Sequence, residues 1–404
     1  MMMLKEKQNI IAALTAALLA LGVFFGIHQL MLSRDKSVAS ITVGFIYDGD
    51  ASTPYTANFI RAADKLQTEY HDRVKVIEKY NVPYESAEEV IRELAGEGCS
   101  LIITNSYGYG ETAKAMAAEF PMIQFCEATC DNANDDPALD NYHTFMGEIY
   151  RGRYVSGVVA GAKLNEMIEQ GIIDEDEAVL GYVAAYPVAE VISGYTSFLL
   201  GARSQCPSAV MRVRYTGTWT GYALEKDAAN LLIDEGCVII SHHSNTIGSA
   251  IACESAAKPY TVYHVGYNQD MIDVAPTSEL ISCRIDWTPY ILSAAEAVLA
   301  DEDIESHVKG TVNGNDSGGG FAEGWVTMQE LNAAAAAEGS VELIDKTIAE
   351  LNNGSCHVFS GDYHGTSPDD PSDTCDLNTE YIENEHSSAP TFHYILDGIV
   401  TEDN

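Results

Sequence analysis

Aromatic and polar side chains gather at the predicted ends of the short apolar segments of this chain. Flat rings can stack on a planar heterocycle, while carboxylates and amides can hydrogen-bond to hydroxyl groups and ring nitrogens. The side chains of this kind are Asp48, Tyr55, Asn58, Tyr107, Tyr109, Tyr186, Trp219, His243, Ser244, Asn245, Asn268, Asp270, Asp286 and Trp287. Because the carboxyl ends of parallel strands meet at one edge of a sheet, we expect these side chains to lie close together. They predict a binding site for a planar, polar small molecule.

Each of these residues also has a purely structural interpretation. A tyrosine or tryptophan at a strand end often packs at the rim of a core, and an aspartate there often caps a helix. The adjacent His242 and His243 point to opposite sides of a strand, so a two-histidine metal site is not expected. We interpret His243 as a hydrogen-bonding group. The shared position of the set at strand ends favours binding over packing.

Three catalytic motifs are absent from the sequence. It has no G-x-S-x-G nucleophile turn and no H-E-x-x-H helix, and the glycine run at 318–320 lacks the lysine of a phosphate loop. Asp48-Gly49-Asp50 resembles the calcium-binding start of nucleoside hydrolases, but Ser52-Thr53-Pro54 replaces the paired aspartates that should follow. We therefore expect no enzymatic activity, no metal and no cofactor, with a hydrolase-like enzyme as a distant alternative.

A repeated phrase predicts how these residues are positioned. Residues 97–103, EGCSLII, recur as residues 235–241, EGCVIIS. Each copy follows an amphipathic helical pattern that ends at a glycine, and each continues as a short β-branched apolar run, as a buried parallel strand does. The chain thus resembles one half-fold built twice. Two such lobes would face each other across a cleft.

Strand and helix patterns alternate along most of the chain. Strands are predicted at 41–47, 74–78, 100–104, 122–127, 179–184, 210–215, 238–241, 260–265, 280–285 and 391–397. Helices are predicted at 56–69, 87–95, 111–119, 152–168, 188–202, 222–234, 247–257, 289–300, 328–337 and 341–351. About five strands fall in each half, which is a usual sheet size. The pattern indicates an α/β protein with two Rossmann-like lobes and parallel sheets.

Charge and length narrow the classes of partner. The 404 residues include 60 acidic and 22 basic side chains, for a net charge of −38. This excess opposes long-range attraction to nucleic acid and to anionic lipid. We expect neither as a partner, and the length suits two domains better than one.

The first forty residues differ in kind from the rest. Lys5 and Lys7 precede an apolar run over 10–31, after which 34–36 is charged again. This pattern is typical of a signal sequence or of a membrane anchor, and the two alternatives stay open. No cysteine precedes Cys99, so a lipid-modified cysteine just after the signal is excluded. Either way, the body of the protein is expected outside the cytoplasm, at the cell surface or in the periplasm, attached to the membrane if the segment is uncleaved.

Nine cysteines are compatible with an exported protein, because such proteins can keep disulfides. We expect Cys126 with Cys130, and Cys356 with Cys375, to be able to form disulfides. Neither pair has the spacing of a zinc site.

Several stretches together resemble a known family, the basic membrane protein (Bmp, or PnrA-like) substrate-binding proteins of ABC importers of purine nucleosides. The resemblance covers about residues 41–300 and rests on YRGRY at 150–154, GVVAG at 157–161, GYVAAYP at 181–187, LGARS at 200–204, VGY at 265–267 and WTPY at 287–290. It implies a type I periplasmic-binding-protein fold, in which two lobes joined by three crossing strands close around a ligand. It also implies delivery of the ligand to an ABC permease.

The resemblance implies a domain division and roles for the candidate residues. Residues 41–145 with 268–310 would form the first lobe, and 146–267 with 311–404 the second lobe with a C-terminal extension, after the N-terminal segment 1–40. Asn268, Asp270 and Asp286 would lie where the family holds ribose hydroxyls. Family members often carry an aspartate in place of Asn268, and some carry a basic residue in place of Asp286 with Trp287. The expected ligand is therefore a purine nucleoside or a nucleobase, and the ectodomain of a membrane signalling receptor is the alternative function.

Overall fold

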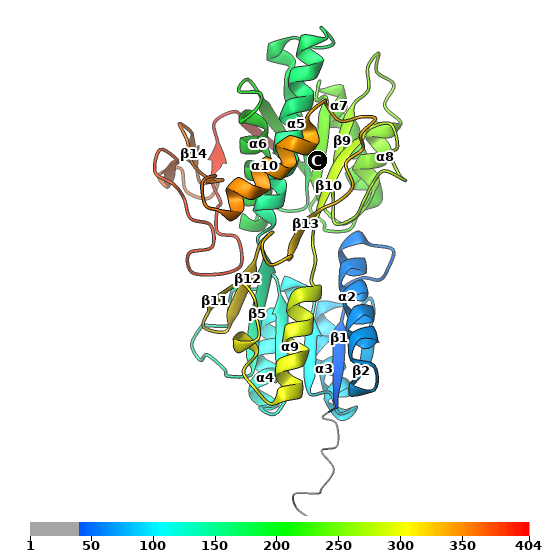
Figure 1. Ribbon diagram of the computed structural model, residues 1–404, viewed down its shortest axis with the longest axis vertical. Coiled ribbons are helices and arrows are strands. Elements are labelled where there is room, and N and C mark those ends of the chain that lie inside the picture. The colour runs from blue at the N-terminus through cyan, green and yellow to red at the C-terminus, as the bar shows by residue number, and fades with distance from the viewer. Residues whose placement is uncertain (1–39, 404) are drawn as a thin grey trace, which may run out of the picture.

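The computed structural model describes residues 40–403, which form two lobes stacked along the long axis of the molecule (Figure 1). The first lobe is built on a seven-stranded sheet of order β11-β12-β5-β4-β3-β1-β2. All neighbours in it are parallel except β11 and β12. Its strands are β1 (Ile41–Ile46), β2 (Val74–Lys79), β3 (Leu101–Thr104), β4 (Gln124–Ala128), β5 (Tyr142–Gly147), β11 (Thr311–Asn313) and β12 (Asp316–Gly319). Its helices are α2 (Pro54–Tyr70), α3 (Ala87–Gly96), α4 (Gly110–Glu119) and α9 (Thr288–Ala300).

The second lobe repeats this design around a sheet of order β13-β10-β9-β8-β6-β7-β17. Only β13 runs antiparallel to its neighbour. Its strands are β6 (Val179–Ala184), β7 (Val210–Tyr215), β8 (Ile239–His243), β9 (Tyr263–Tyr267), β10 (Glu279–Ile285), β13 (Val326–Met328) and β17 (Ile399–Asp403). Its helices are α5 (Ile149–Glu169), α6 (Ala189–Arg203), α7 (Tyr222–Asp234), α8 (Gly248–Glu254) and α10 (Ser340–Asn352).

Smaller elements complete the described chain. A third sheet of order β15-β14-β16 is formed by β14 (His364–Thr366), β15 (Thr374–Asp376) and β16 (Ile395–Leu396). Single 3₁₀ turns lie at His71–Arg73, Tyr84–Ser86, Tyr107–Tyr109, Glu175–Glu177 and Ile304–Ser306. The third sheet lies beside the second lobe, where the chain approaches its C-terminus (Figure 1).

The repeated phrase occupies the same place in both lobes. Its first copy leads from α3 into β3, which pairs with β1, and its second copy leads from α7 into β8, which pairs with β6. Read from one edge, five strands of the first sheet have the order β2-β1-β3-β4-β5. The second sheet has the same order in the strands β7-β6-β8-β9-β10, so the two sheets share one topology. The predicted duplication is thus confirmed. The predicted α/β class with two mostly parallel sheets is confirmed as well, although each sheet has seven strands rather than five.

The chain crosses between the lobes at three places, between β5 and α5, between β10 and α9, and between β12 and β13. Strand β10 pairs with β9 of the second sheet, whereas the expected division placed residues 268–310 in the first lobe. Strands β11 and β12 pair in the first sheet, whereas the expected division placed residues 311–404 in the second.

Helices α5 and α6 of the second lobe pack with their backbones in close contact. A Cβ atom on Gly157 would lie 2.0 Å from the carbonyl oxygen of Phe198, and one on Gly161 would lie 2.3 Å from that of Ala202. On α6, a Cβ atom on Gly201 would lie 2.1 Å from the carbonyl oxygen of Tyr154. Only glycine lets the two backbones come this close. The glycines of the 157–161 stretch therefore have a packing role.

Two expected elements differ from the structure. The helix expected at 328–337 is wrong: strand β13 ends at Met328 and turns follow. The side chain of Asn332 accepts a hydrogen bond from the Ala334 amide and donates one to the Pro276 carbonyl, which holds this segment in a turn. Of the strand expected at 391–397, only Ile395–Leu396 (β16) forms a strand. A turn at Gly398, with φ of +90°, follows it, and β17 begins at Ile399.

The expected disulfides are absent, because all nine cysteines are free thiols. Cys126 accepts a hydrogen bond from the Tyr290 hydroxyl, with 3.4 Å between oxygen and sulfur. Cys130 lies instead against the Tyr107 carbonyl, at 3.5 Å. The two sulfurs thus have different partners.

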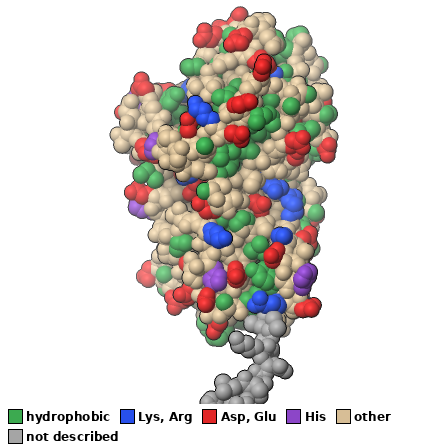
Figure 2. Space-filling model, in the orientation of Figure 1, with side chains coloured by type: hydrophobic (Ala, Val, Ile, Leu, Met, Phe, Trp, Pro, Cys, Tyr) green, Lys and Arg blue, Asp and Glu red, His purple; other side chains and the backbone are tan. Residues whose placement is uncertain are grey.

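The expected N-terminal signal or anchor, residues 1–40, falls almost wholly outside the described residues. Within residues 40–403, none of the helices has both the length and the apolar character needed to cross a bilayer. Acidic side chains are spread over both lobes on the face shown in Figure 2.

Candidate ligand-binding cleft

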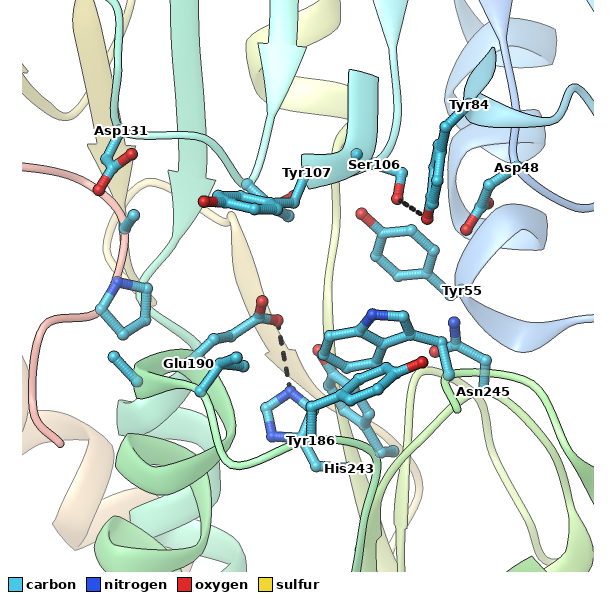
Figure 3. Close-up of a pocket in the computed structure, with 18 residues that line it drawn as sticks. Asp48, Tyr55, Tyr84, Ser106, Tyr107, Asp131, Tyr186, Glu190, His243 and Asn245 are labelled. Atoms are coloured by element: carbon cyan, nitrogen blue, oxygen red, sulfur yellow. Dashed lines mark hydrogen bonds and ion pairs between the residues drawn. The ribbon is translucent and has the colours of Figure 1, made fainter. Parts of the chain in front are cut away.

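A cavity of about 470 Å³ is lined by residues of both lobes (Figure 3). Its size is in the range of small-molecule sites, which are usually about 300–1,000 Å³. The walls come from the loops at the carboxyl ends of β1, β3 and β4 in the first lobe and of β6, β7, β8 and β9 in the second. This is the edge of each sheet at which α/β proteins bind ligands.

Asp48 follows β1 and supplies a carboxylate to the first-lobe wall. One of its oxygens accepts hydrogen bonds from the Asn105 amide, at 3.1 Å, and from the Thr56 hydroxyl, at 3.3 Å. The backbone amide of Asp48 donates in turn to the Asn105 side chain. Burial raises the pKa of Asp48, although these hydrogen bonds oppose the shift. The carboxylate is therefore held in one orientation at the cavity wall.

Three tyrosines line the same wall. Tyr55, near the start of α2, donates a hydrogen bond to the Asn105 carbonyl, and the hydroxyls of Tyr84 and Ser106 lie 2.8 Å apart. Tyr107 is 68% exposed, so most of its ring remains free. Gly108 leaves room for the Tyr84 ring, because a Cβ atom there would lie 2.6 Å from it. The first lobe thus presents rings with fixed hydroxyls and one open face.

The second lobe presents a chain of rings in edge contact. Tyr186 and Trp219 have centroids 5.7 Å apart, Trp219 and His243 6.3 Å, and His243 and Tyr267 4.8 Å. Asn245 donates its backbone amide to the Trp219 carbonyl at 2.8 Å, which ties the β8 loop to the β7 loop. Each ring therefore restricts the position of the next.

The cavity is acidic. Asp48, Asp131 and Glu190 line it, while no lysine or arginine does so within the described part of the chain. His243 Nε2 lies 3.4 Å from Glu190 Oε1 (Figure 3). Burial nevertheless lowers the pKa of His243, against the opposing effect of Glu190. The imidazole is consequently neutral at pH 7 and leaves the negative charge of the carboxylates uncompensated.

Half of the residues predicted for the site line this cavity. They are Asp48, Tyr55, Tyr107, Tyr186, Trp219, His243 and Asn245. All of them lie at the end of a strand, in the loop that follows it or at the start of the next helix, which explains why strand-end reasoning brings them together.

The other predicted residues lie elsewhere. Tyr109 and Trp287 are buried in the first lobe: the Tyr109 hydroxyl donates to the Val82 carbonyl, and the Trp287 ring stacks on Phe59 with centroids 4.5 Å apart. Asn58 donates to the Asn268 carbonyl at 3.1 Å, and both side chains are buried.

The last three of these residues fix local turns. Ser244 is buried, with its hydroxyl 3.4 Å from His242. Asp270 accepts the Ile272 amide at 2.8 Å and is exposed. Asp286 accepts the Thr288 amide at 3.0 Å, at the start of α9.

Several lining residues were not among the predicted ones. Tyr84 follows the β2 strand, Glu190 lies in the first turn of α6 after Tyr186, and Tyr267 ends β9, so all three satisfy the strand-end criterion. Asp131 lies in the loop after β4. Ala389 and Pro390 come from the C-terminal region and carry no signal of this kind in the sequence.

Comparisons with known proteins agree with the fold. The family model of PnrA-like ABC transporter substrate-binding proteins (Bmp) matches residues 36–352. A purine-binding protein of Brucella abortus (strain 2308) is 30% identical over 324 residues, covering 80% of this chain and 83% of that protein. A putative ABC transporter glucose-binding protein of Haloferax volcanii (strain ATCC 29605) is 31% identical over 227 residues, covering 56% of this chain and 51% of that protein.

Solved structures show the same fold. A solute-binding protein of an ABC transporter from Conexibacter woesei DSM 14684 superposes with a TM-score of 0.61 at 18% identity, covering 79% of this chain and 98% of that one. A second, from Aeropyrum pernix K1, gives a TM-score of 0.59 at 15% identity, covering 78% of this chain and 88% of that one. The expected type I periplasmic-binding-protein fold is thereby confirmed. The chain belongs to the PnrA-like family of ABC transporter substrate-binding proteins, which are extracytoplasmic and are not enzymes.

Proposed function

We propose that this protein captures a purine nucleoside or nucleobase in the cavity between its lobes and delivers it to an ABC permease. The observation that carries the proposal is that aromatic rings from both lobes line one cavity, with Tyr55, Tyr84 and Tyr107 on one side and Tyr186, Trp219 and Tyr267 on the other. Stacking of a base on an aromatic ring contributes about 1–3 kcal/mol per ring. The purine-binding relative supports the same ligand class.

The charge of the cavity favours neutral ligands over phosphorylated ones. Asp48, Asp131 and Glu190 can accept hydrogen bonds from the exocyclic amine of a base or from ribose hydroxyls. A phosphate group would meet these carboxylates without a lysine or arginine from the described residues at the cavity wall. We therefore expect nucleosides and bases to bind, and nucleotides to bind much more weakly.

A sugar is the second candidate ligand. The relative named as a putative glucose-binding protein motivates it, and so does the pairing of rings with carboxylates, which also suits a ring of hydroxyl groups. The number of rings favours a purine, because a sugar needs fewer flat surfaces than six tyrosine and tryptophan side chains provide.

A thermal-shift screen of the purified protein against adenosine, guanosine, adenine, adenosine monophosphate and glucose tests the proposal. A ligand that binds only the folded protein raises the melting temperature in proportion to the logarithm of its concentration over its dissociation constant. A shift with a purine but not with the nucleotide supports the proposal. A shift with glucose and none with any purine would overturn it.

A further inference from the structure

The C-terminal region supplies one wall of the ligand cavity. The family match ends at residue 352, yet Ala389 and Pro390 line the cavity together with residues of both lobes. In Figure 3 this segment, drawn in faint red, runs along the side of the cavity that carries Asp131. We refer to residues 383–392 as the strap. The question is whether the strap is held there firmly enough to act as a wall.

On the side of the first lobe, the strap is bound by hydrogen bonds at β11 and β12. The Ser388 hydroxyl donates to Asp316 at 2.7 Å, and the Ser388 backbone amide donates to the other oxygen of the same carboxylate. The Thr144 hydroxyl on β5 also donates to Asp316 at 2.7 Å. Asn313 donates its side-chain amide to the His386 carbonyl. Since Asp316 and Ser388 are both buried, the hydrogen bonds to Asp316 are shielded from water.

On the side of the second lobe, the strap is held by packing of Phe392 in the hydrophobic core. The Phe392 ring is fully buried and stacks on Phe359 with centroids 4.5 Å apart. Within the strap itself, the buried carboxylate of Glu383 accepts the backbone amides of Thr391, at 3.1 Å, and Phe392, at 2.8 Å, which fixes the conformation of this end of the strap. A few residues later, β17 pairs with β7 of the second sheet. The strap is therefore fixed on both sides of Ala389 and Pro390.

We propose that the strap is a specificity-determining wall, in which Ala389 and Pro390 limit the size of the ligand that the cavity accepts. This inference rests on the proposed function of the cavity. A wall fixed to both lobes cannot move outward without breaking the Ser388–Asp316 bonds or unseating Phe392. A larger side chain at Ala389 must therefore take space from the ligand, and a larger ligand loses more than a smaller one.

Calorimetric titration of the Ala389→Leu variant with adenosine, adenine and glucose tests this wall. The affinity for adenosine should fall about tenfold or more, because the larger side chain takes space in a fixed site that the ligand needs. The loss for adenine, which lacks the ribose, should be smaller. The matched control is His386→Leu, which places the same side chain in the strap at a position whose own side chain is 86% exposed and outside the cavity. The control should bind like the wild type, and both variants should melt as the wild type does.

The possible outcomes distinguish a failure of the strap proposal from a failure of the proposed purine-binding function. The proposed role of the strap would be contradicted if Ala389→Leu bound adenosine and adenine with wild-type affinity. It would also be contradicted if Ala389→Leu and His386→Leu lost affinity equally. In both cases the purine proposal would stand. If the wild type binds glucose and neither purine, the purine proposal fails, and the same comparison with glucose decides the wall: a loss in Ala389→Leu alone supports it. If Ala389→Leu misfolds, Ala389→Val replaces it, with the same two expected affinities.

Discussion

His243 and Glu190 contact each other at the second-lobe wall of the cavity, with imidazole Nε2 3.4 Å from carboxylate Oε1. His243 comes from the end of β8 and Glu190 from the first turn of α6, so the pair joins two neighbouring elements. Burial lowers the pKa of His243, while the carboxylate of Glu190 favours the protonated ring. The contact therefore brings a neutral imidazole and a carboxylate together at the cavity wall.

Replacing Glu190 should shift the titration of His243. In Glu190→Gln the pKa of His243 should fall further below its ordinary value, because the carboxylate that favours the imidazolium is gone while burial remains. An NMR titration of the His243 ring resonances between pH 4 and pH 8 measures this shift. The exposed His386, whose resonance should not respond to the substitution, serves as the internal reference. An unchanged or higher pKa in the variant would show that the two side chains do not interact.

Removing the ring of Trp219 should weaken ligand binding. In Trp219→Ala we expect the affinity for adenosine to fall about tenfold or more, since a stacking ring contributes about 1–3 kcal/mol. The matched control is Tyr109→Phe, because Tyr109 is buried outside the cavity and its hydroxyl donates to the Val82 carbonyl. That control should lose about 1 kcal/mol of stability and keep its affinity. If calorimetry finds that Trp219→Ala binds adenosine as tightly as the wild type, Trp219 does not contact the ligand.

Glu225 should make the stability of the protein depend on pH. It is buried and accepts a hydrogen bond from Thr246 at 2.6 Å, beside the loop that carries Asn245. Burial raises its pKa from 4.5 to about 7. The folded state therefore favours the protonated form of Glu225. The contribution of Glu225 to the free energy of unfolding is fully present below pH 4.5 and is lost as the pH rises to 7.

The Glu225→Gln variant isolates this contribution, because glutamine cannot ionise and can still accept the Thr246 hydrogen bond. The free energy of unfolding of the wild type, relative to the variant, should fall by roughly 3 kcal/mol between pH 4.5 and pH 7. Urea unfolding of both proteins at pH 4.5, 6 and 8 measures the difference. A difference that stays constant across this range would mean that Glu225 has an ordinary pKa in the folded protein.

Adding one methyl group between α5 and α6 should destabilise the second lobe. In Gly161→Ala the new Cβ would lie 2.3 Å from the Ala202 carbonyl oxygen, so the helices must move apart. We expect a loss of about 1–3 kcal/mol or more. Gly96→Ala is the control, because a Cβ there has no neighbour within 4 Å and φ is negative. It should leave the urea midpoint unchanged or raise it slightly, and an equal loss in both variants would contradict the packing role.

Strand-end reasoning predicted the part of the site that depends on the backbone. Asp48, Tyr186 and Trp219 each lie in the loop that follows a strand, and the direction of a parallel strand fixes the edge of the sheet at which it ends. The predicted family is likewise confirmed, because the stretches that carry the resemblance, such as 150–154 and 181–187, are local residue patterns. The fold is confirmed for the same reason, since the alternation of strand and helix is also local.

Side-chain direction and distant chain segments could not be predicted in the same way. Tyr107 and Tyr109 lie on one 3₁₀ turn, yet the turn points Tyr107 outward and buries Tyr109, a distinction that spacing alone does not make. Trp287 follows a strand but turns its ring onto Phe59. Ala389 and Pro390 reach the cavity only because Ser388 and Phe392 bind separate lobes, a tertiary arrangement with no local pattern.

Calorimetric titration of the wild-type protein with adenosine, with adenosine monophosphate and glucose in parallel, tests the central claim most directly. An aromatic, acidic cavity should bind adenosine with a dissociation constant on the order of micromolar or tighter, and the nucleotide at least about tenfold more weakly. Heat of binding for glucose, with none for adenosine, would contradict the proposed ligand class.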